Sequence, residues 1–224
     1  MLYLYAITYS EAGIKVDVAG VHGAPVRPFC HGSLAAILSE HADLRLMPDA
    51  DQLWAHEAVL EAVMEDAPVL PMRLGSVVPD EAAVALMLDE RREVFEHALE
   101  NVRGAVELGF RAAIGAGEGQ SLEVAAVGSG GPGTAYLMQR LGAQQRRDAL
   151  GEPVHARLCE LARRHTALSS SLEGTSVTAA YLVDVDLVDS FRELVEGLQR
   201  EVDGVTLTCT GPWPPYSFTT PEPV

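Results

Sequence analysis

A glycine-rich run is the first stretch of this sequence whose residue types and spacing could do chemistry. Residues Gly128–Gly133 match the GxGxxG pattern, in which glycines let the backbone approach a dinucleotide pyrophosphate. The run follows a strand-like piece and precedes a predicted helix. However, no second strand or ribose-binding acidic residue follows promptly, and Pro132 removes an amide that could point at phosphate. A flexible loop is therefore the better interpretation, with a nucleotide-dependent enzyme as the alternative.

The three cysteines, Cys30, Cys159 and Cys209, are scattered and odd in number. None lies in a CxxC pair, and we assign none of them a histidine at ligand spacing, so we predict no structural zinc site. Cys30 and the adjacent His31 could form a weak metal or redox pair, but ordinary loop residues are the simpler interpretation. No export signal is apparent, so we expect reduced thiols in a cytoplasm.

The other residue types that could support catalysis form no constellation. Residues Ser169–Ser171 lack the GxSxG context of a nucleophile elbow. Glu57, Glu61 and Glu65 recur at every fourth position, which is typical of a solvated helix face, and no metal-binding motif is found to oppose them. His56 lies within a predicted helix and is expected to be a packing or surface residue. We therefore predict no enzymatic activity, no catalytic or metal-binding residue and no cofactor.

The composition excludes several classes of partner. The chain has 224 residues, a net charge of −16 and a pI of about 4.7. Binding to nucleic acid or to anionic lipid requires clustered Lys and Arg, so neither partner is expected. Nearly half of the residues, 48%, are hydrophobic, which is ample for the packed core of one large domain or two small ones. No apolar run reaches the length needed to span a membrane.

A short apolar run, Pro68–Val78, lies between two segments with helix-like patterns. Its length and its Val and Leu content favour a buried strand over a helix. Pro68 and Pro71 lack backbone donors, so the first part of this strand is expected at a sheet edge, an entry or a bulge. Arg73 within this run needs a carboxylate partner or a position at the rim if its guanidinium is buried. The alternative is that Arg73 and Gly75 form an edge that contacts a partner.

Hydrophobic periodicity predicts the elements around this run. Tyr3, Tyr5 and Tyr9 are expected to share one face of the first strand. Strands are predicted at residues 2–9, 34–38, 106–114, 177–185 and 205–210, with a further short one at 16–21. Helices are predicted at residues 48–65, 79–103 and 186–201, with a helical region at 134–166 that is broken near 151–153. Loops are predicted at 23–32 and 115–133. This order indicates an α+β fold of two split βαβ units, with helices on one face of each mainly antiparallel sheet.

The C-terminal segment Gly211–Phe218 contains three prolines and cannot be helical, so an extended tail is expected. Trp213, Tyr216 and Phe218 make this tail rich in aromatic rings. The rings could close over the core as a latch. Alternatively, they could contact a protein partner, because aromatic anchors dominate interface energetics.

Three of these segments, taken together and in order, resemble the marked segments of the gas vesicle protein GvpF/GvpL family. They are Leu2–Ile7, Pro68–Val77 and Gly211–Phe218, and Ala135–Leu137 also resembles the start of a helix in that family. The resemblance implies an N-terminal ferredoxin-like domain over residues 1–103 and a C-terminal modified ferredoxin-like domain over 104–210. The latter includes the glycine-rich loop at 115–133. The extended tail then covers 211–224.

The resemblance also implies a function. Members of this family are non-enzymatic accessory proteins, located in the cytoplasm and at the gas vesicle, that serve as minor vesicle components or assembly factors. They are thought to bind the small, very hydrophobic wall subunit and other accessory proteins. The residues expected to bind a partner are Arg73, Gly75, Trp213, Tyr216 and Phe218. The alternative functions are a nucleotide-dependent enzyme that uses Gly128–Gly133 and a small-molecule sensor with a pocket between its domains.

Overall fold

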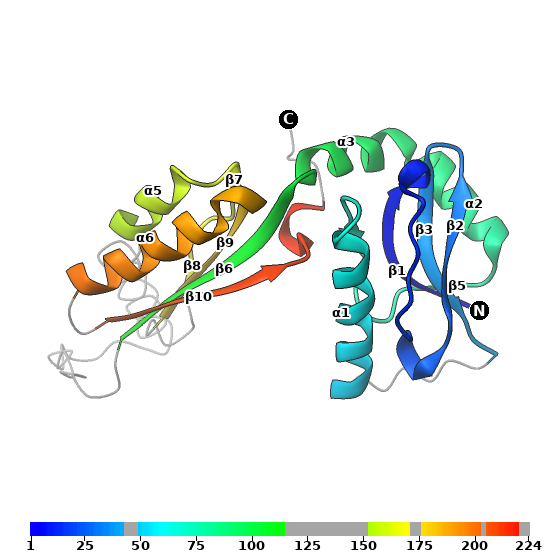
Figure 1. The fold of residues 1–224 in the computed structure, drawn as a ribbon, viewed down its shortest axis with the longest axis horizontal. Coiled ribbons are helices and arrows are strands. Elements are labelled where there is room, and N and C mark those ends of the chain that lie inside the picture. Colours follow the sequence, from blue (N-terminus) through cyan, green and yellow to red (C-terminus); the bar gives the residue numbers. More distant parts are fainter. Residues whose placement is uncertain (43–48, 115–151, 171–175, 203–204, 220–224) are drawn as a thin grey trace, which may run out of the picture. The chain divides into compact units, whose positions relative to one another are not determined.

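The computed structural model describes residues 1–42, 49–114, 152–170, 176–202 and 205–219. By internal contacts the chain divides into two units, which are Met1–Val106 with Trp213–Val224, and Glu107–Pro212. Each unit combines helices with an antiparallel five-stranded sheet (Figure 1). The α+β fold class predicted from the sequence is confirmed.

The sheet of the first unit has the strand order β2-β3-β1-β4, and β5 also pairs with β1. Strand β1 is central, because it pairs antiparallel with β3 along one side and with both β4 and β5 along the other. The short strands β4 and β5 therefore share one edge of the sheet. The strands of this unit are β1 (Leu2–Tyr9), β2 (Val26–His31), β3 (Leu34–Glu40), β4 (Leu70–Pro71) and β5 (Val77–Val78).

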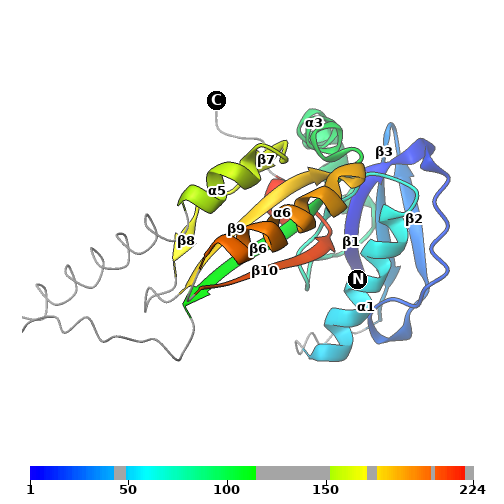
Figure 2. The same cartoon turned by 60° about the vertical axis from the view of Figure 1, so that its left-hand side comes forward.

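Three helices cover both faces of the first sheet (Figures 1 and 2). They are α1 (Ala50–Met64), α2 (Glu81–Glu90) and α3 (Arg92–Val102). Successive side chains of β2 point to opposite faces of the sheet, so their contacts show which helix lies on which face. Val26 packs against the core cluster that contains α1 residues, whereas the neighbouring Arg27 forms an ion pair with Glu81 of α2. The expectation that helices cover a single face is therefore wrong for this unit.

The helix boundaries follow from capping. Helix α1 begins after Asp49, whose side chain accepts the backbone N–H of Gln52, close to the predicted start. Asp80 caps α2 in the same way. The single helix predicted at 79–103 is two helices, because the backbone at Arg91 leaves helical geometry (φ −118°, ψ 16°). Neither Gly nor Pro marks this break, so periodicity alone does not reveal it.

A β-bulge in β1 separates Tyr9 from Tyr3 and Tyr5, so the prediction that all three tyrosines share one face is wrong for Tyr9. The pairing register with β3 shifts between Leu4 and Ala6, which leaves Tyr5 as the extra residue. Tyr3 and Tyr5 both contact His56 of α1. Beyond the bulge the alternation is inverted, and the Tyr9 hydroxyl instead donates to the backbone carbonyl of Glu96 in α3.

The loop predicted at 23–32 is mostly strand. β2 pairs with β3 through a turn in which Gly32 has a positive φ of 61°. Pro28 is compatible with this strand because β2 is the outermost strand of the sheet. The short strand predicted at 16–21 is wrong, since that segment contributes only an isolated bridge between Ala19 and Pro25.

The second unit has the strand order β10-β6-β9-β7, and β8 also pairs with β9. Its strands are β6 (Ala105–Ile114), β7 (Arg164–His165), β8 (Ser169–Ser170), β9 (Ser176–Asp184) and β10 (Val205–Trp213), and its described helices are α5 (Glu152–Cys159) and α6 (Val188–Glu201). Both helices lie on one face, because the Tyr181 ring of β9 contacts His155 of α5 and Phe191 of α6 (Figure 2).

The predicted elements of the second unit are confirmed at β6, β9, β10 and α6. The helical region predicted at 134–166 is wrong at its end, because α5 stops at Cys159 and Arg164–His165 is a strand. Residues 134–151 and the predicted glycine-rich loop at 115–133 lie outside the described residues.

Candidate functional site

The central segment forms an interrupted edge strand. The backbone N–H of Ser76 donates to the carbonyl of Arg73 at 3.0 Å, and Gly75 has φ +89°. This is the geometry of a type II turn, whose third position needs a positive φ and therefore favours glycine. The turn separates β4 from β5, so the prediction of one continuous strand is wrong. The predicted position at a sheet edge agrees with the strand order.

The first two residues of the turn, Arg73 and Leu74, lie in different environments. Leu74 packs against the core cluster of the first unit, whereas the Arg73 side chain is exposed. Arg73 is therefore not a buried guanidinium, and its exposed position agrees with the rim position of the first interpretation. The alternative, that Arg73 and Gly75 form an edge that contacts a partner, stays a prediction. Val77 of β5 is 42% exposed on the same edge. We call residues 70–78 the open edge; Leu70 and Pro71 of β4 are buried within it, and its exposed residues are Arg73 and Val77.

A buried hydrogen-bond network fixes the turn of the open edge. The Gly75 N–H donates to the Tyr3 hydroxyl at 3.2 Å, and that hydroxyl is 2.9 Å from His56 Nδ1. His56 Nε2 lies 3.0 Å from the carbonyl oxygen of Met72. A carbonyl only accepts, so Nε2 carries the proton and Nδ1 accepts from Tyr3. The network thus requires neutral His56, and it holds the turn at both Met72 and Gly75.

Burial lowers the pKa of His56, and its hydrogen bond to Met72 only partly offsets this effect. Burial also raises the pKa of Tyr3 to about 12, so the Tyr3 hydroxyl stays protonated at neutral pH. The Tyr5 ring stacks on His56 with centroids 5.4 Å apart. Protonation of His56 would remove the acceptor that Tyr3 needs.

We predict that His56 makes folding stability sensitive to acid. Its pKa in the folded state lies below the value of about 6.5 expected in the unfolded chain. Below that value the unfolded state binds the proton more readily, so stability is lost as the pH falls through this window. The loss should approach about 1.4 kcal/mol per pH unit at most.

Urea unfolding at a series of pH values between about 7 and 5 checks this prediction, with His56→Gln beside the wild type. The variant should have the shallower slope of unfolding free energy against pH. His97→Gln is the matched control, because His97 is exposed on α3 and should leave the slope unchanged. Equal slopes for the wild type and His56→Gln would contradict the assigned role.

The prediction that residues 211–218 form an extended, non-helical tail is wrong at Tyr216–Phe218, which is a short 3-10 helix, whereas residues 211–213 belong to β10. The tail places its aromatic side chains in two environments. Phe218 is only 2% exposed, and Tyr216 packs against the core cluster of the first unit. The Tyr216 hydroxyl donates to Glu57 of α1 at 2.7 Å. Trp213 differs, since it is 38% exposed. Tyr216 and Phe218 thus form the latch that the sequence offered as one alternative, whereas Trp213 remains available for contact.

Helix α1 connects the open edge with the tail. His56 contacts the turn of the open edge, and the next residue, Glu57, accepts the hydrogen bond from Tyr216. Burial raises the pKa of Glu57, although the Tyr216 hydrogen bond lowers it in part. Glu57 was predicted to lie on a solvated helix face with Glu61 and Glu65. It instead holds the tail through its hydrogen bond with Tyr216.

Sequence reasoning missed one exposed aromatic residue. Trp54 of α1 is 64% exposed. Its neighbour Leu53 is also exposed, at 42%. The buried positions of α1 instead include Gln52, His56 and Val59. The signal was present in the sequence, because Trp54 lies outside the stripe defined by His56 and Val59 at helical spacing.

The other predicted candidates are separated or untested. Cys30 is exposed, and the next β2 residue, His31, bonds through Nε2 to Asp89 at 2.9 Å, so the two do not form a joint site. Ser169–Ser170 is strand β8, paired with β9. Gly128–Gly133 and Ser171 lie outside the described residues.

The prediction that no cysteine has a histidine at metal-ligand spacing is wrong for Cys159. His155 precedes Cys159 by four residues on α5, which places both side chains on one face of the helix. His165 of β7 completes a group of three residues that could hold a metal ion.

The fold and the site define a class of protein. The exposed features are an interrupted sheet edge, an arginine and aromatic side chains. This combination is typical of a protein that acts by contact with other proteins. In the described part of the chain, no helix has both the length and the apolar character needed to cross a bilayer.

The family model "Gas vesicle synthesis protein GvpL/GvpF" matches residues 1–220, and the chain belongs to this family. It is 36% identical to gas vesicle protein L of Streptomyces sp. (strain CB03234), a match that covers 96% of this chain and 91% of the relative. It is 27% identical to gas vesicle protein F1 of Halobacterium salinarum (strain ATCC 700922 / JCM 11081 / NRC-1), with coverage of 97% and 92%.

Solved structures share the fold. The crystal structure of GvpF from Anabaena sp. PCC7120 matches with a TM-score of 0.82 at 19% identity, over 99% of this chain and 96% of that one. GvpF from Microcystis aeruginosa matches with a TM-score of 0.78 at 18% identity, over 98% of each chain. Membership of the family suggests a role in gas vesicle formation, and the family consists of gas vesicle structural or accessory proteins that are not known enzymes.

Proposed function

We propose that this chain is a non-enzymatic gas vesicle assembly factor that binds the vesicle wall protein through the open edge. The observation that carries the proposal is the edge itself, where, among the described residues, β4 and β5 pair with β1 on one side only. In this proposal the protein acts in the cytoplasm and at the growing vesicle, together with other accessory proteins.

The physics of sheet edges supports this mode of binding. An edge strand presents backbone N–H and C=O groups that another chain can pair with, and neighbouring side chains supply specificity. The edge here is short and interrupted by the turn at Gly75, which limits uncontrolled self-association. A hydrophobic wall subunit held at this edge would be shielded before it joins the shell.

The predicted contact residues have different roles in this proposal. Arg73 and Trp213 are exposed and would touch the partner, since Arg and Trp are enriched among residues that dominate interface energetics. Gly75 would act through the turn that it permits. Tyr216 and Phe218, which pack on the first unit, would act by holding the tail in place.

Co-purification of the tagged full chain with co-expressed wall protein tests the proposal. Arg73→Ala and Trp213→Ala should each reduce the affinity for the wall protein by roughly 30-fold, as expected for central contact residues that each contribute about 2 kcal/mol. Because both side chains are exposed, neither change should disturb the fold.

Two matched controls separate a local effect from a change in charge or apolar area. Arg111→Ala removes an exposed arginine from β6 of the second unit, and Leu86→Ala removes an exposed apolar side chain from α2. Both controls should bind like the wild type. Equal retention by Arg73→Ala, Trp213→Ala and the wild type would reject these two contact residues.

A further inference from the structure

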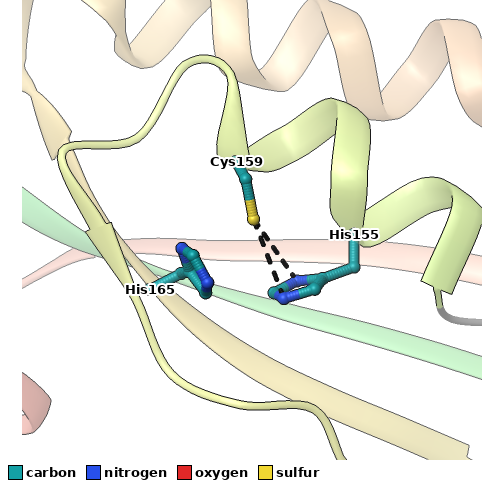
Figure 3. A group of neighbouring side chains, drawn as sticks. All are labelled: His155, Cys159 and His165. Atoms are coloured by element: carbon teal, nitrogen blue, oxygen red, sulfur yellow. Dashed lines mark hydrogen bonds between the residues drawn. The ribbon is translucent and has the colours of Figure 1, made fainter.

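Two histidines and a cysteine of the second unit converge beneath helix α5. His155 and Cys159 lie one helical turn apart on α5, and His165 lies on strand β7, which follows that helix (Figure 3). Each residue offers one ligand atom, and the three atoms lie within 4.8 Å of one another. Imidazole nitrogen and thiolate sulfur are the ligands preferred by zinc-class ions.

The spacing of the ligand atoms fits a tetrahedral ion. Cys159 Sγ is 3.7 Å from His155 Nε2. An ion with a Zn–S bond of about 2.3 Å and a Zn–N bond of about 2.1 Å holds the two ligand atoms about 3.6 Å apart at the tetrahedral angle. The His155 and His165 rings have centroids 4.9 Å apart and are nearly perpendicular, at 82°. Small side-chain rotations would therefore complete the site.

A buried hydroxyl orients one of the ligands. Tyr181 of β9 is fully buried, and its hydroxyl is hydrogen-bonded to His155 Nδ1. That bond engages Nδ1, so Nε2, which lies 3.7 Å from Cys159 Sγ, is the nitrogen that would ligate; Nδ1 lies 3.9 Å from the same sulfur. Metal-binding histidines commonly have their second nitrogen hydrogen-bonded in this way, which selects the tautomer that ligates.

The local environment favours ligation through neutral imidazole. Burial, and then the neighbouring His165, lower the pKa of His155, so this ring is uncharged at neutral pH. Burial raises the pKa of the Cys159 thiol, so an ion must displace its proton on binding. His155 and Cys159 are half-buried and His165 is exposed, which gives an ion a route from solvent.

We propose that His155, Cys159 and His165 bind a zinc-class divalent ion through two imidazoles and one thiolate. The three side chains leave a fourth tetrahedral position for water or for a ligand atom from a partner. This arrangement with an open position contrasts with a closed structural zinc site, which uses four protein ligands. The inference is independent of the proposed binding to the wall protein.

Cobalt(II) titration of the full chain, followed by displacement with zinc, tests the proposal. A tetrahedral cobalt site with a thiolate gives visible d–d bands and a sulfur-to-cobalt charge-transfer band. The wild type should show both at one equivalent of cobalt and lose them when zinc is added. Cys159→Ser should lose the charge-transfer band, and His165→Asn should weaken cobalt binding. Tyr181→Phe should weaken it about tenfold, as loss of an orienting hydrogen bond does.

The other two cysteines provide matched controls. Cys30→Ser and Cys209→Ser should retain the spectrum of the wild type, because neither residue belongs to the cluster. Zinc should also raise the melting temperature of the wild type and leave that of Cys159→Ser unchanged, because an ion bound only by the native state stabilises it. Absence of a charge-transfer band in the wild type, or its persistence in Cys159→Ser, would overturn the assignment.

Discussion

Replacing Phe218 with alanine is expected to destabilise the first unit by about 3–5 kcal/mol, the usual cost of removing a buried phenylalanine side chain. Phe218 is 2% exposed, although it lies only six residues from the end of the chain. By internal contacts, its segment belongs to the unit that begins at Met1. The tail is therefore part of the folded first unit, and its loss should open a cavity that the core does not refill.

Chemical denaturation monitored by circular dichroism measures this effect. Trp213→Ala is the matched control, because it removes another aromatic ring from the same tail at a position that is 38% exposed. This control should cost at most about 1 kcal/mol. A loss below about 1 kcal/mol for Phe218→Ala would contradict the assigned latch. Truncation after Gly211 would remove both the latch and Trp213, so point variants are the cleaner probes of binding.

Gly20→Ala is expected to destabilise the first unit by about 3 kcal/mol, from overpacking together with a lost buried hydrogen bond. A Cβ atom at Gly20 would lie 2.1 Å from the Tyr5 hydroxyl and 2.7 Å from Val26 Cγ2. The Tyr5 hydroxyl is buried, accepts the Val21 N–H at 2.9 Å and bonds to Ser39 Oγ at 2.8 Å. Tyr5 cannot move without breaking this network.

Gly197→Ala provides a control with the opposite sign. Gly197 lies within α6, where a Cβ atom would have, among the described residues, only Arg200 Nη2 within 4 Å, at 3.9 Å. Alanine there should stabilise the protein by about 0.5–1 kcal/mol, because glycine weakens a helix interior by that amount. Melting temperatures of the two variants should therefore shift in opposite directions. Equal behaviour of both variants would show that the contact at Gly20 is not tight.

The parts of the fold predicted correctly are those with strong local signals. The β-branched and aromatic run of Leu2–Tyr9 is strand β1, and Asp49 caps α1 close to the predicted start. The errors lie at positions where tertiary contacts, rather than the local sequence pattern, determine the backbone conformation. Tyr5 is bulged because β1 and β3 are out of register there, and Arg91 interrupts a periodic helix without any Gly or Pro to mark the break.

The candidate site was predictable only in part, for similar reasons. Gly75 signals a turn through its conformational freedom, but its hydrogen bond to Tyr3 joins residues 72 positions apart and could not be foreseen. The aromatic residues of the tail were identified, yet their division between buried and exposed positions depends on packing. The group of His155, Cys159 and His165 was missed because His165 was assigned to a helix, whereas it lies on strand β7.

The open edge of the first unit is the surface that we propose holds the vesicle wall protein. The most direct measurement is co-purification of wall protein with the tagged full chain, with the wild type and Arg73→Ala compared at equal amounts of folded protein. We expect the wild type to retain wall protein and the variant to lose most of it. Absence of wall protein on the folded wild type would contradict direct binding. A thermal-shift screen with NAD, NADP, FAD and ATP would then become the next test.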